Sequence, residues 1–217
     1  MKYIFTEEQF LALLAVGNIE RLYSFKMIDD MEDEALIDAV HSLYGRRWLQ
    51  EREDRLVPCP ALEEMLAVMR SAAWAVKIQL FQPGLSQRLL YPEEAGTAVI
   101  LERCQTSREL SMKLQRARQE ELIFEIMDNE LEAYAPALTE EEEGALCLEE
   151  MYREGRPVFE AERVRTEDGG TEAGLTVRAL PFLCLVRWEW GDTVSLALYS
   201  DNYFKELFQQ ITGGEAA

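Results

Sequence analysis

His41 is the only histidine in the 217-residue chain, and it therefore limits the acid–base chemistry that the protein can perform. Histidine is the usual general acid or base near neutral pH, and a Ser-His-Asp triad would have to use it. No Gly-x-Ser-x-Gly motif supplies a serine nucleophile, and no local pattern supports a dyad with Cys59. His41 follows Val40 in a segment with helical spacing. We expect it to be structural or simply exposed.

Motifs that hold metals or nucleotides are also missing from the sequence. A zinc site needs three or four closely spaced Cys or His ligands, and the phosphate-binding patterns Gly-x-x-x-x-Gly-Lys and Gly-x-Gly-x-x-Gly do not occur. We therefore expect no metal and no cofactor. Paired carboxylates could hydrolyse a glycosidic bond, but among 41 acidic residues a suitable pair is expected by chance. We expect a non-enzymatic protein, with a carboxylate-dependent hydrolase as an alternative.

The net charge of −19 disfavours two classes of partner. Nucleic-acid affinity depends on Lys and Arg, and anionic membrane surfaces repel a negative protein. The charge either keeps the protein in solution or attracts a basic partner surface. The first residues lack the apolar core of a signal peptide, and acidic residues follow at Glu7 and Glu8. No apolar run approaches the ~20 residues of a membrane span. We expect a cytoplasmic protein.

The four cysteines are widely spaced and have apolar neighbours, a pattern typical of buried free thiols in a reducing compartment. A disulfide between two of them is not excluded by the sequence. They are Cys59, Cys104, Cys147 and Cys184.

The first half of the chain changes from helical to strand-like patterns. Thr6 and Gln9 form a capping box ahead of apolar residues at helical spacing, and further helices are predicted over 33–44 and from Pro60 to Met69. Alternation then predicts strands of an antiparallel meander with short connections. These strands cover 75–81, 88–91, 97–101 and 109–114, with a turn at Pro83-Gly84.

The second half repeats this order of helices followed by strands. We predict helices over 119–131 and from a capping box at Thr139 to Met151, then strands, then a final helix beginning near Asp201. The strands cover 158–165, 175–180, 183–190 and 193–199. The prediction is a single α+β domain over 1–217, built from antiparallel β-meanders with packed helices. The order also allows a pseudo-repeat of two halves, 1–116 and 117–217.

The segment 33–57 has the outline of a winged-helix module, because a predicted helix precedes a short hairpin over 48–57. Four arginines cluster around this hairpin, but nearby acidic residues nearly cancel their charge. DNA binding is therefore disfavoured, and a winged-helix transcriptional regulator is kept as an alternative. The arginines are candidate partner-binding residues: Arg46, Arg47, Arg52 and Arg55.

Trp188 and Trp190 alternate on one predicted strand and should face the same side of it. Two interpretations stay open. They fill the core beneath the last helix, or they are exposed and act as anchors for a partner protein.

The chain resembles the EspG-type chaperones associated with ESX (type VII) secretion. The resemblance rests on the opening segment Phe5-Thr6-Glu7-Glu8-Gln9-Phe10 followed by Leu13, on Arg55-Leu56-Val57-Pro58, and on the helix 62–69 and strand 76–81 that follow. It implies an α+β fold with a central antiparallel sheet, no catalytic residues, and cytosolic binding of a helical secreted protein.

The leading hypothesis is thus a non-enzymatic cytosolic chaperone or adaptor that binds a protein partner, such as a type VII secretion substrate. The sequence does not fix its oligomeric state.

Overall fold

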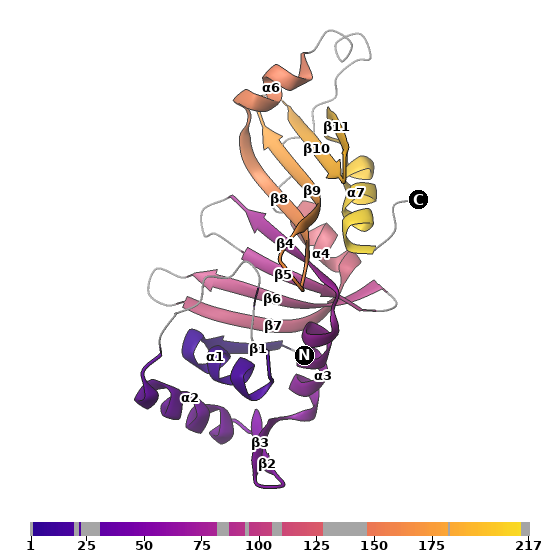
Figure 1. Ribbon diagram of the computed structural model, residues 1–217. Coiled ribbons are helices and arrows are strands. Elements are labelled where there is room, and N and C mark those ends of the chain that lie inside the picture. The colour runs from indigo at the N-terminus through magenta and orange to yellow at the C-terminus, as the bar shows by residue number, and fades with distance from the viewer. Residues whose placement is uncertain are drawn as a thin grey trace.

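The structure is a computed structural model that describes residues 2–19, 22, 31–81, 87–93, 96–105, 110–127, 147–181 and 183–213 (Figure 1). The helices are α1 (Glu7–Val16), α2 (Asp33–Gly45), α3 (Pro60–Ser71), α4 (Gln119–Ile126), α6 (Leu148–Glu154) and α7 (Asp201–Gly213). The strands of the first half are β1 (Lys2–Thr6), β2 (Leu49–Arg52), β3 (Arg55–Pro58), β4 (Trp74–Leu80), β5 (Gln87–Pro92), β6 (Thr97–Gln105) and β7 (Leu110–Arg118). Those of the second half are β8 (Arg156–Arg165), β9 (Thr171–Ala179), β10 (Cys184–Trp190) and β11 (Thr193–Leu198).

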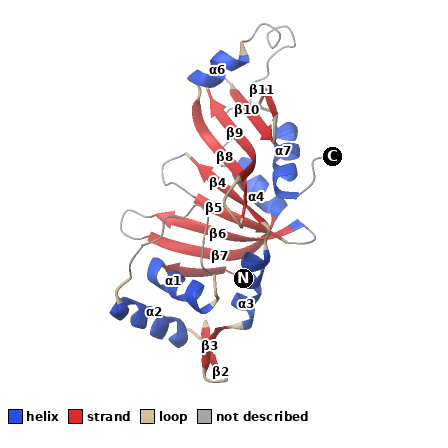
Figure 2. Cartoon of the chain, in the orientation of Figure 1, coloured by secondary structure: helices blue, strands red, loops and turns tan. Residues whose placement is uncertain are grey.

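Nine strands form one antiparallel sheet in the order β1-β7-β6-β5-β4-β8-β9-β10-β11, and β2 and β3 form a separate hairpin (Figure 2). Each predicted meander is present, β4 to β7 and β8 to β11, which confirms the α+β class with antiparallel meanders. The two meanders are joined edge to edge by β4 and β8, which pair from Trp74↔Arg165 to Leu80↔Phe159. The division into two halves as a pseudo-repeat stays a prediction.

Helices α1, α2 and α3 cover one face of the first meander. Alternate residues of β5, β6 and β7 point to this face and form one apolar cluster with β1 and the three helices. Leu13 of α1, Leu43 of α2 and Leu66 of α3 are fully buried in it. Burying a side chain of this size stabilises the fold by roughly 1.5–3 kcal/mol, so this cluster holds the N-terminal helices on the sheet.

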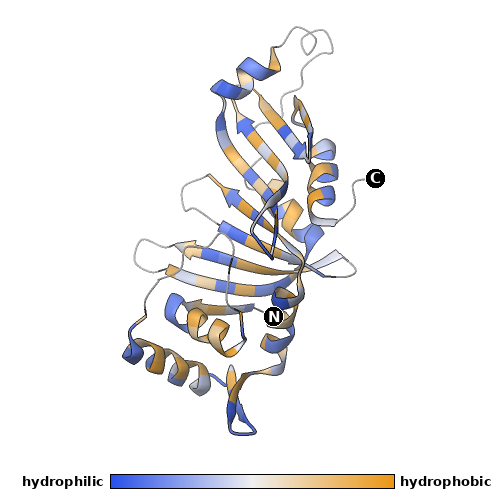
Figure 3. Cartoon of the chain, viewed as in Figure 1, coloured by the Kyte–Doolittle hydropathy of each residue, from blue (hydrophilic) through white to orange (hydrophobic). Residues whose placement is uncertain are grey.

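Helices α4 and α7 cover the opposite face, across the junction between the meanders. Their apolar side chains pack on the other set of alternate residues of β4 to β6 and on β8 to β10. Phe159 of β8 contacts Phe204 and Phe208 of α7 with ring centroids 5.2 and 6.1 Å apart. The central strands are therefore apolar on both faces, whereas the outer strands alternate between apolar and polar residues (Figure 3).

The first residues of the chain form an edge strand that the sequence prediction missed. Lys2–Thr6 pairs with β7, and its buried residues Tyr3 and Phe5 alternate with exposed ones. The predicted capping box is present: the Thr6 hydroxyl accepts from the Gln9 backbone N–H, and the Gln9 side chain accepts from the Thr6 N–H. The strand therefore passes directly into α1.

Four further predictions differ from the structure or fall outside the described residues. The helix predicted over 119–131 is described as far as Met127, whereas the capping box at Thr139 and the turn at Pro83-Gly84 lie outside the described residues. All four thiols are free, but the prediction that all are buried is wrong. Only Cys184 is buried, whereas Cys59 and Cys104 are half-buried and Cys147 is exposed at the start of α6. Apolar sequence neighbours do not bury a residue that precedes a short surface helix.

The predicted hairpin at β2 and β3 closes through an energetically unfavourable turn. Glu53 and Asp54 are its two central residues, and both have positive φ, 53° and 59°. A two-residue hairpin of this kind favours Asn-Gly, because left-handed backbone is costly for other residues.

We expect Asp54→Gly to raise the free energy of unfolding by about 1 kcal/mol, because glycine adopts positive φ without a steric penalty. Urea unfolding followed by circular dichroism measures this. Asp192→Gly is the matched control, since in the other two-residue turn Gly191 has positive φ and Asp192 does not. An equal gain from both variants would contradict the explanation.

Candidate protein-binding surfaces

Each meander has one face that the helices α1 to α3, α4 and α7 leave largely uncovered, and polar side chains line it. On the first meander this face carries Arg88, Glu102, Cys104, Ser111 and Lys113, opposite α1 to α3; we call it the first polar face. On the second meander and the adjoining strand β4, the face opposite α7 carries Lys77, Glu160, Glu162, Arg178 and Arg187; we call it the second polar face. The strand registers place the residues of each set on neighbouring strands.

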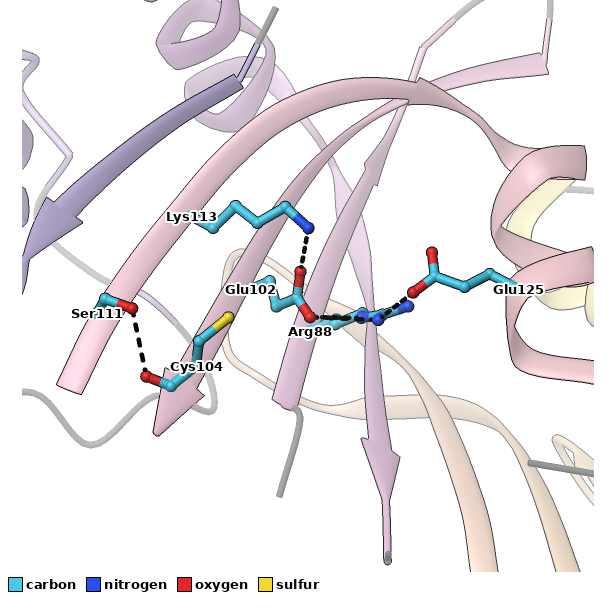
Figure 4. Close-up of polar contacts among 6 residues, drawn as sticks. All are labelled: Arg88, Glu102, Cys104, Ser111, Lys113 and Glu125. Atoms are coloured by element: carbon cyan, nitrogen blue, oxygen red, sulfur yellow. Dashed lines mark hydrogen bonds and ion pairs between the residues drawn. The ribbon is translucent and has the colours of Figure 1, made fainter. Parts of the chain in front are cut away.

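Four charged side chains form a network on the first polar face (Figure 4). Nη2 of Arg88 lies 3.2 Å from Oε1 of Glu102 and 2.7 Å from Oε1 of Glu125, which comes from α4. Nζ of Lys113 lies 2.7 Å from Oε2 of Glu102. Glu102 is the direct cross-strand neighbour of both cations, so the register of β5, β6 and β7 builds the network.

Because this network is buried, losing one of its charges would lower the stability of the fold. Arg88 and Glu102 are each 7% exposed. Burial disfavours the charge of Arg88, but the carboxylates of Glu102 and Glu125 outweigh it, so the pKa of the guanidinium is raised above its ordinary value. A buried charge that loses its partner is strongly destabilising. Glu102 therefore holds both cations in place.

Cys104 and Ser111 lie at the outer end of the first polar face. Ser111 Oγ donates a hydrogen bond of 3.5 Å to the carbonyl oxygen of Cys104. Burial and the nearby Glu102 carboxylate raise the pKa of the Cys104 thiol, which keeps it protonated near neutral pH. The hydrogen bond therefore links neighbouring strands at this end of the face, and the protonated Cys104 thiol is not activated as a nucleophile.

The second polar face is organised around Tyr152 of α6. The guanidinium carbons of Arg178 and Arg187 lie 4.8 and 5.7 Å from the centre of its ring. Arg178 also donates to the carbonyl oxygens of Tyr152 and Gly155, at 3.3 and 3.2 Å, and so fixes the end of α6 against the sheet. Burial and the neighbouring Glu162 raise the pKa of Glu160 on the same face. The result is a half-exposed surface of mixed charge.

A shallow cleft of about 1010 Å³ lies between the C-terminal ends of α3 and α7, beside the ends of strands β4 to β7. Arg116 lies on one side of it and holds Glu93 through two contacts, of 2.7 Å from Nε and 2.8 Å from Nη2. The cleft is lined by Val68, Ser71, Ala72, Trp74, Pro92, Glu93, Gly96, Thr97, Arg116, Gln119, Thr212 and Gly213. Its charged groups already pair with each other, so it offers no strongly activated group.

All four predicted arginines are exposed around the β2–β3 hairpin: Arg46, Arg47, Arg52 and Arg55. The guanidinium of Arg46 lies 4.9 Å above the ring of Trp48, which packs on the N-terminal apolar cluster. The hairpin projects from the end of the molecule opposite β10, so these arginines and the predicted tryptophans do not form one site (Figure 1). The role of the arginines in partner binding stays a prediction.

The two tryptophans differ in their surroundings. Trp188 is 7% exposed and belongs to the apolar cluster beneath α7, which agrees with the core-filling interpretation. Trp190 is partly buried, and the guanidinium of Arg163 lies between it and Trp74, 5.3 and 3.7 Å from the two ring centres. Burial lowers the pKa of Arg163. A partner-binding role for this strand stays a prediction.

The charged network is the feature that the sequence prediction missed. The sequence does contain a signal for it, since Arg88 and Glu102 are charged and buried in strands whose neighbouring positions carry Leu89, Leu90 and Leu101. Recognising them requires the register of three strands, which no local pattern supplies.

His41, the only histidine, is exposed on α2. Within the described ranges, no three His, Cys, Asp or Glu side chains lie together as they would around a metal ion. Nor does any helix described here have the length and apolar character needed to span a membrane.

Together these elements define an α+β protein built on one antiparallel sheet with helices on both faces. No protein-family model and no curated protein matches the sequence. A solved structure does match: the Mycobacterium tuberculosis type VII secretion system chaperone EspG5 in complex with a PE25–PPE41 dimer. The TM-score is 0.63 with 8% sequence identity, and the match covers 97% of this chain and 95% of that one. At this identity the similarity shows the fold alone.

We expect Glu102→Gln to lower the free energy of unfolding by about 3 kcal/mol, because Arg88 and Lys113 would lose their shared carboxylate in a buried setting. Glu125→Gln is the matched control. Its side chain is 52% exposed, and the expected loss is below about 1 kcal/mol. Urea unfolding at pH 7 compares the two variants. Equal losses would show that burial of the network does not determine its energy.

Proposed function

We propose that this protein is a non-enzymatic cytosolic chaperone or adaptor that binds a helical secreted protein, of the kind exported by a type VII system. The observation that carries the proposal is the similarity to EspG5, which extends over nearly all of both chains. That chaperone was solved in complex with a PE25–PPE41 dimer. A partner of this chain would be a protein of the same general kind, kept soluble before export.

The chemistry of the described surfaces supports a binding role. The first polar face carries paired charges. The pKa of the Cys104 thiol is raised, so the thiol is not activated as a nucleophile. Surfaces of mixed charge with satisfied pairs provide orientation and specificity to protein interfaces more than they provide catalysis.

The β2–β3 hairpin is the region we assign to partner contact. It projects from the sheet, and its arginines are exposed in a chain of net charge −19. Arginine is enriched at protein interfaces because its planar group pairs with carboxylates and stacks on aromatic rings. The acidic residues Glu34 and Asp38 are exposed on α2 beside this region, which disfavours a phosphate backbone as the partner.

The experiment is affinity purification of the tagged full chain from its native host after cross-linking in cells, with partners identified by mass spectrometry. We expect a helical secreted protein to co-purify, and its soluble level to fall several-fold when this protein is absent. Recovery of the chain alone under all growth conditions would contradict the proposal.

The double variant Arg52→Glu with Arg55→Glu is expected to reduce the recovered partner at least about tenfold. Arg118→Glu with Arg153→Glu is the matched control, since both residues are exposed elsewhere and the net charge changes equally. If a partner is recovered equally with both double variants, the hairpin is excluded as the contact while the chaperone function stands.

A further inference from the structure

Strand β11 ends the nine-stranded sheet, and within the described part of the chain no element pairs with its outer side. The hydrogen bonds show which residues point outward. Tyr199 N donates to Cys184 O at 2.9 Å, and Gly191 N donates to Glu172 O at 3.3 Å. The odd-numbered residues of β11 therefore bond to β10, and the backbone groups of Val194, Leu196 and Leu198 point away from the sheet.

This edge lacks the features that normally prevent strands from pairing between molecules. Thr193–Leu198 contains no charged residue and no proline, although the chain as a whole has a net charge of −19. Proteins usually protect such edges with lysine, proline or a bulge. The opposite edge, β1, begins with an exposed lysine, Lys2. Of the two edge strands, β11 therefore lacks a charged residue that would discourage pairing, whereas β1 has one.

The side chains of β11 favour a second copy of the same strand. Val194, Leu196 and Leu198 share one face, and in an antiparallel pair centred on Leu196 each apolar residue meets another: Leu196 meets Leu196 of the second copy, and Val194 meets Leu198. Leu196 and Leu198 already pack beside buried Leu185 and Tyr152, so the apolar surface would continue across the symmetry axis. The outward groups supply roughly six main-chain hydrogen bonds.

The surrounding elements leave room for this pairing. Of the described helices, two contact β11. Helix α6 packs with Leu196 and Leu198 on one face of the strand, and α7 packs on β8 and β9 and reaches β11 through the hydroxyls of Tyr203 and Ser195, 3.4 Å apart. Val194 is 54% exposed. We propose that two copies of this chain associate through β11, forming one continuous antiparallel sheet about a two-fold axis. This inference concerns self-association and stands independently of the proposed function.

Sedimentation velocity of the purified full chain over a range of concentrations tests the proposal. We expect a monomer–dimer equilibrium that strengthens as salt rises, because each copy is strongly negative and salt screens the repulsion between them. A wild type that stays monomeric at all concentrations and salt levels would overturn the proposal.

Val194→Lys should weaken dimerisation at least about tenfold, since it places a charge at the pairing edge. Ile4→Lys is the matched control on β1, because Ile4 is 50% exposed on the other edge strand; it should leave dimerisation unchanged. A dimer that withstands Val194→Lys, or that Ile4→Lys disrupts equally, would assign the interface to another surface.

Cross-linking gives a second measurement that does not depend on how the lysine variants fold. In a Cys147→Ser background, which removes the exposed thiol, Leu196→Cys should form an intermolecular disulfide under mild oxidation. Hydrogen-bonded antiparallel pairs have Cα atoms ~5.5 Å apart, which suits a disulfide. Ser195→Cys should cross-link far less, because it does not meet itself across the axis. Equal cross-linking of the two variants, or none, would overturn the pairing.

Discussion

The pairing of β4 with β8 is the constraint on which the rest of the structure depends. It joins two meanders that are separate in the sequence, through a continuous register from Trp74↔Arg165 to Leu80↔Phe159. Without it, β4 and β8 would each present an unpaired edge with apolar residues on it. With it, both become central strands, and the two unpaired edges move to β1 and β11 at the ends of the sheet.

This arrangement explains why the two polar faces exist. Helices α1 to α3 pack on one side of the first meander, and α7 packs on the other side of the second, so only the junction is covered on both sides. Strands β4 to β6 are apolar in both directions there, as Leu89 and Leu90 illustrate. Away from the junction one side of each meander lacks that cover, and charged side chains line it. The placement of the helices thus separates the apolar core from the two polar faces.

The sequence predicts local structure well and long-range pairing poorly. The capping box at Thr6, the hairpin before Pro58 and the alternation in both meanders are local patterns, and the structure has the corresponding elements. Strand β1 was missed because Lys2–Thr6 is short and runs directly into a helix, and only its pairing with β7 makes it a strand. The Arg88–Glu102 pair depends likewise on a register that no single segment contains. The role of Trp188 could not be predicted for a similar reason. Its spacing assigns it to one face of a strand, but the sequence does not show whether a helix covers that face.

The similarity to EspG5 indicates which features of the sequence specify this fold. With 8% identity over 97% of the chain, the two proteins share few residues in common positions, yet a fold with TM-score 0.63 persists. Apolar alternation along the strands and apolar stripes on the helices tolerate such replacement, because many side chains of suitable volume fill a core. Exposed charges do not interchange in this way, since specificity depends on which groups meet a partner and which repel a competitor. The exposed arginines of the hairpin, the charge pairs of the polar faces and the uncharged edge at β11 are therefore features that the shared fold does not determine.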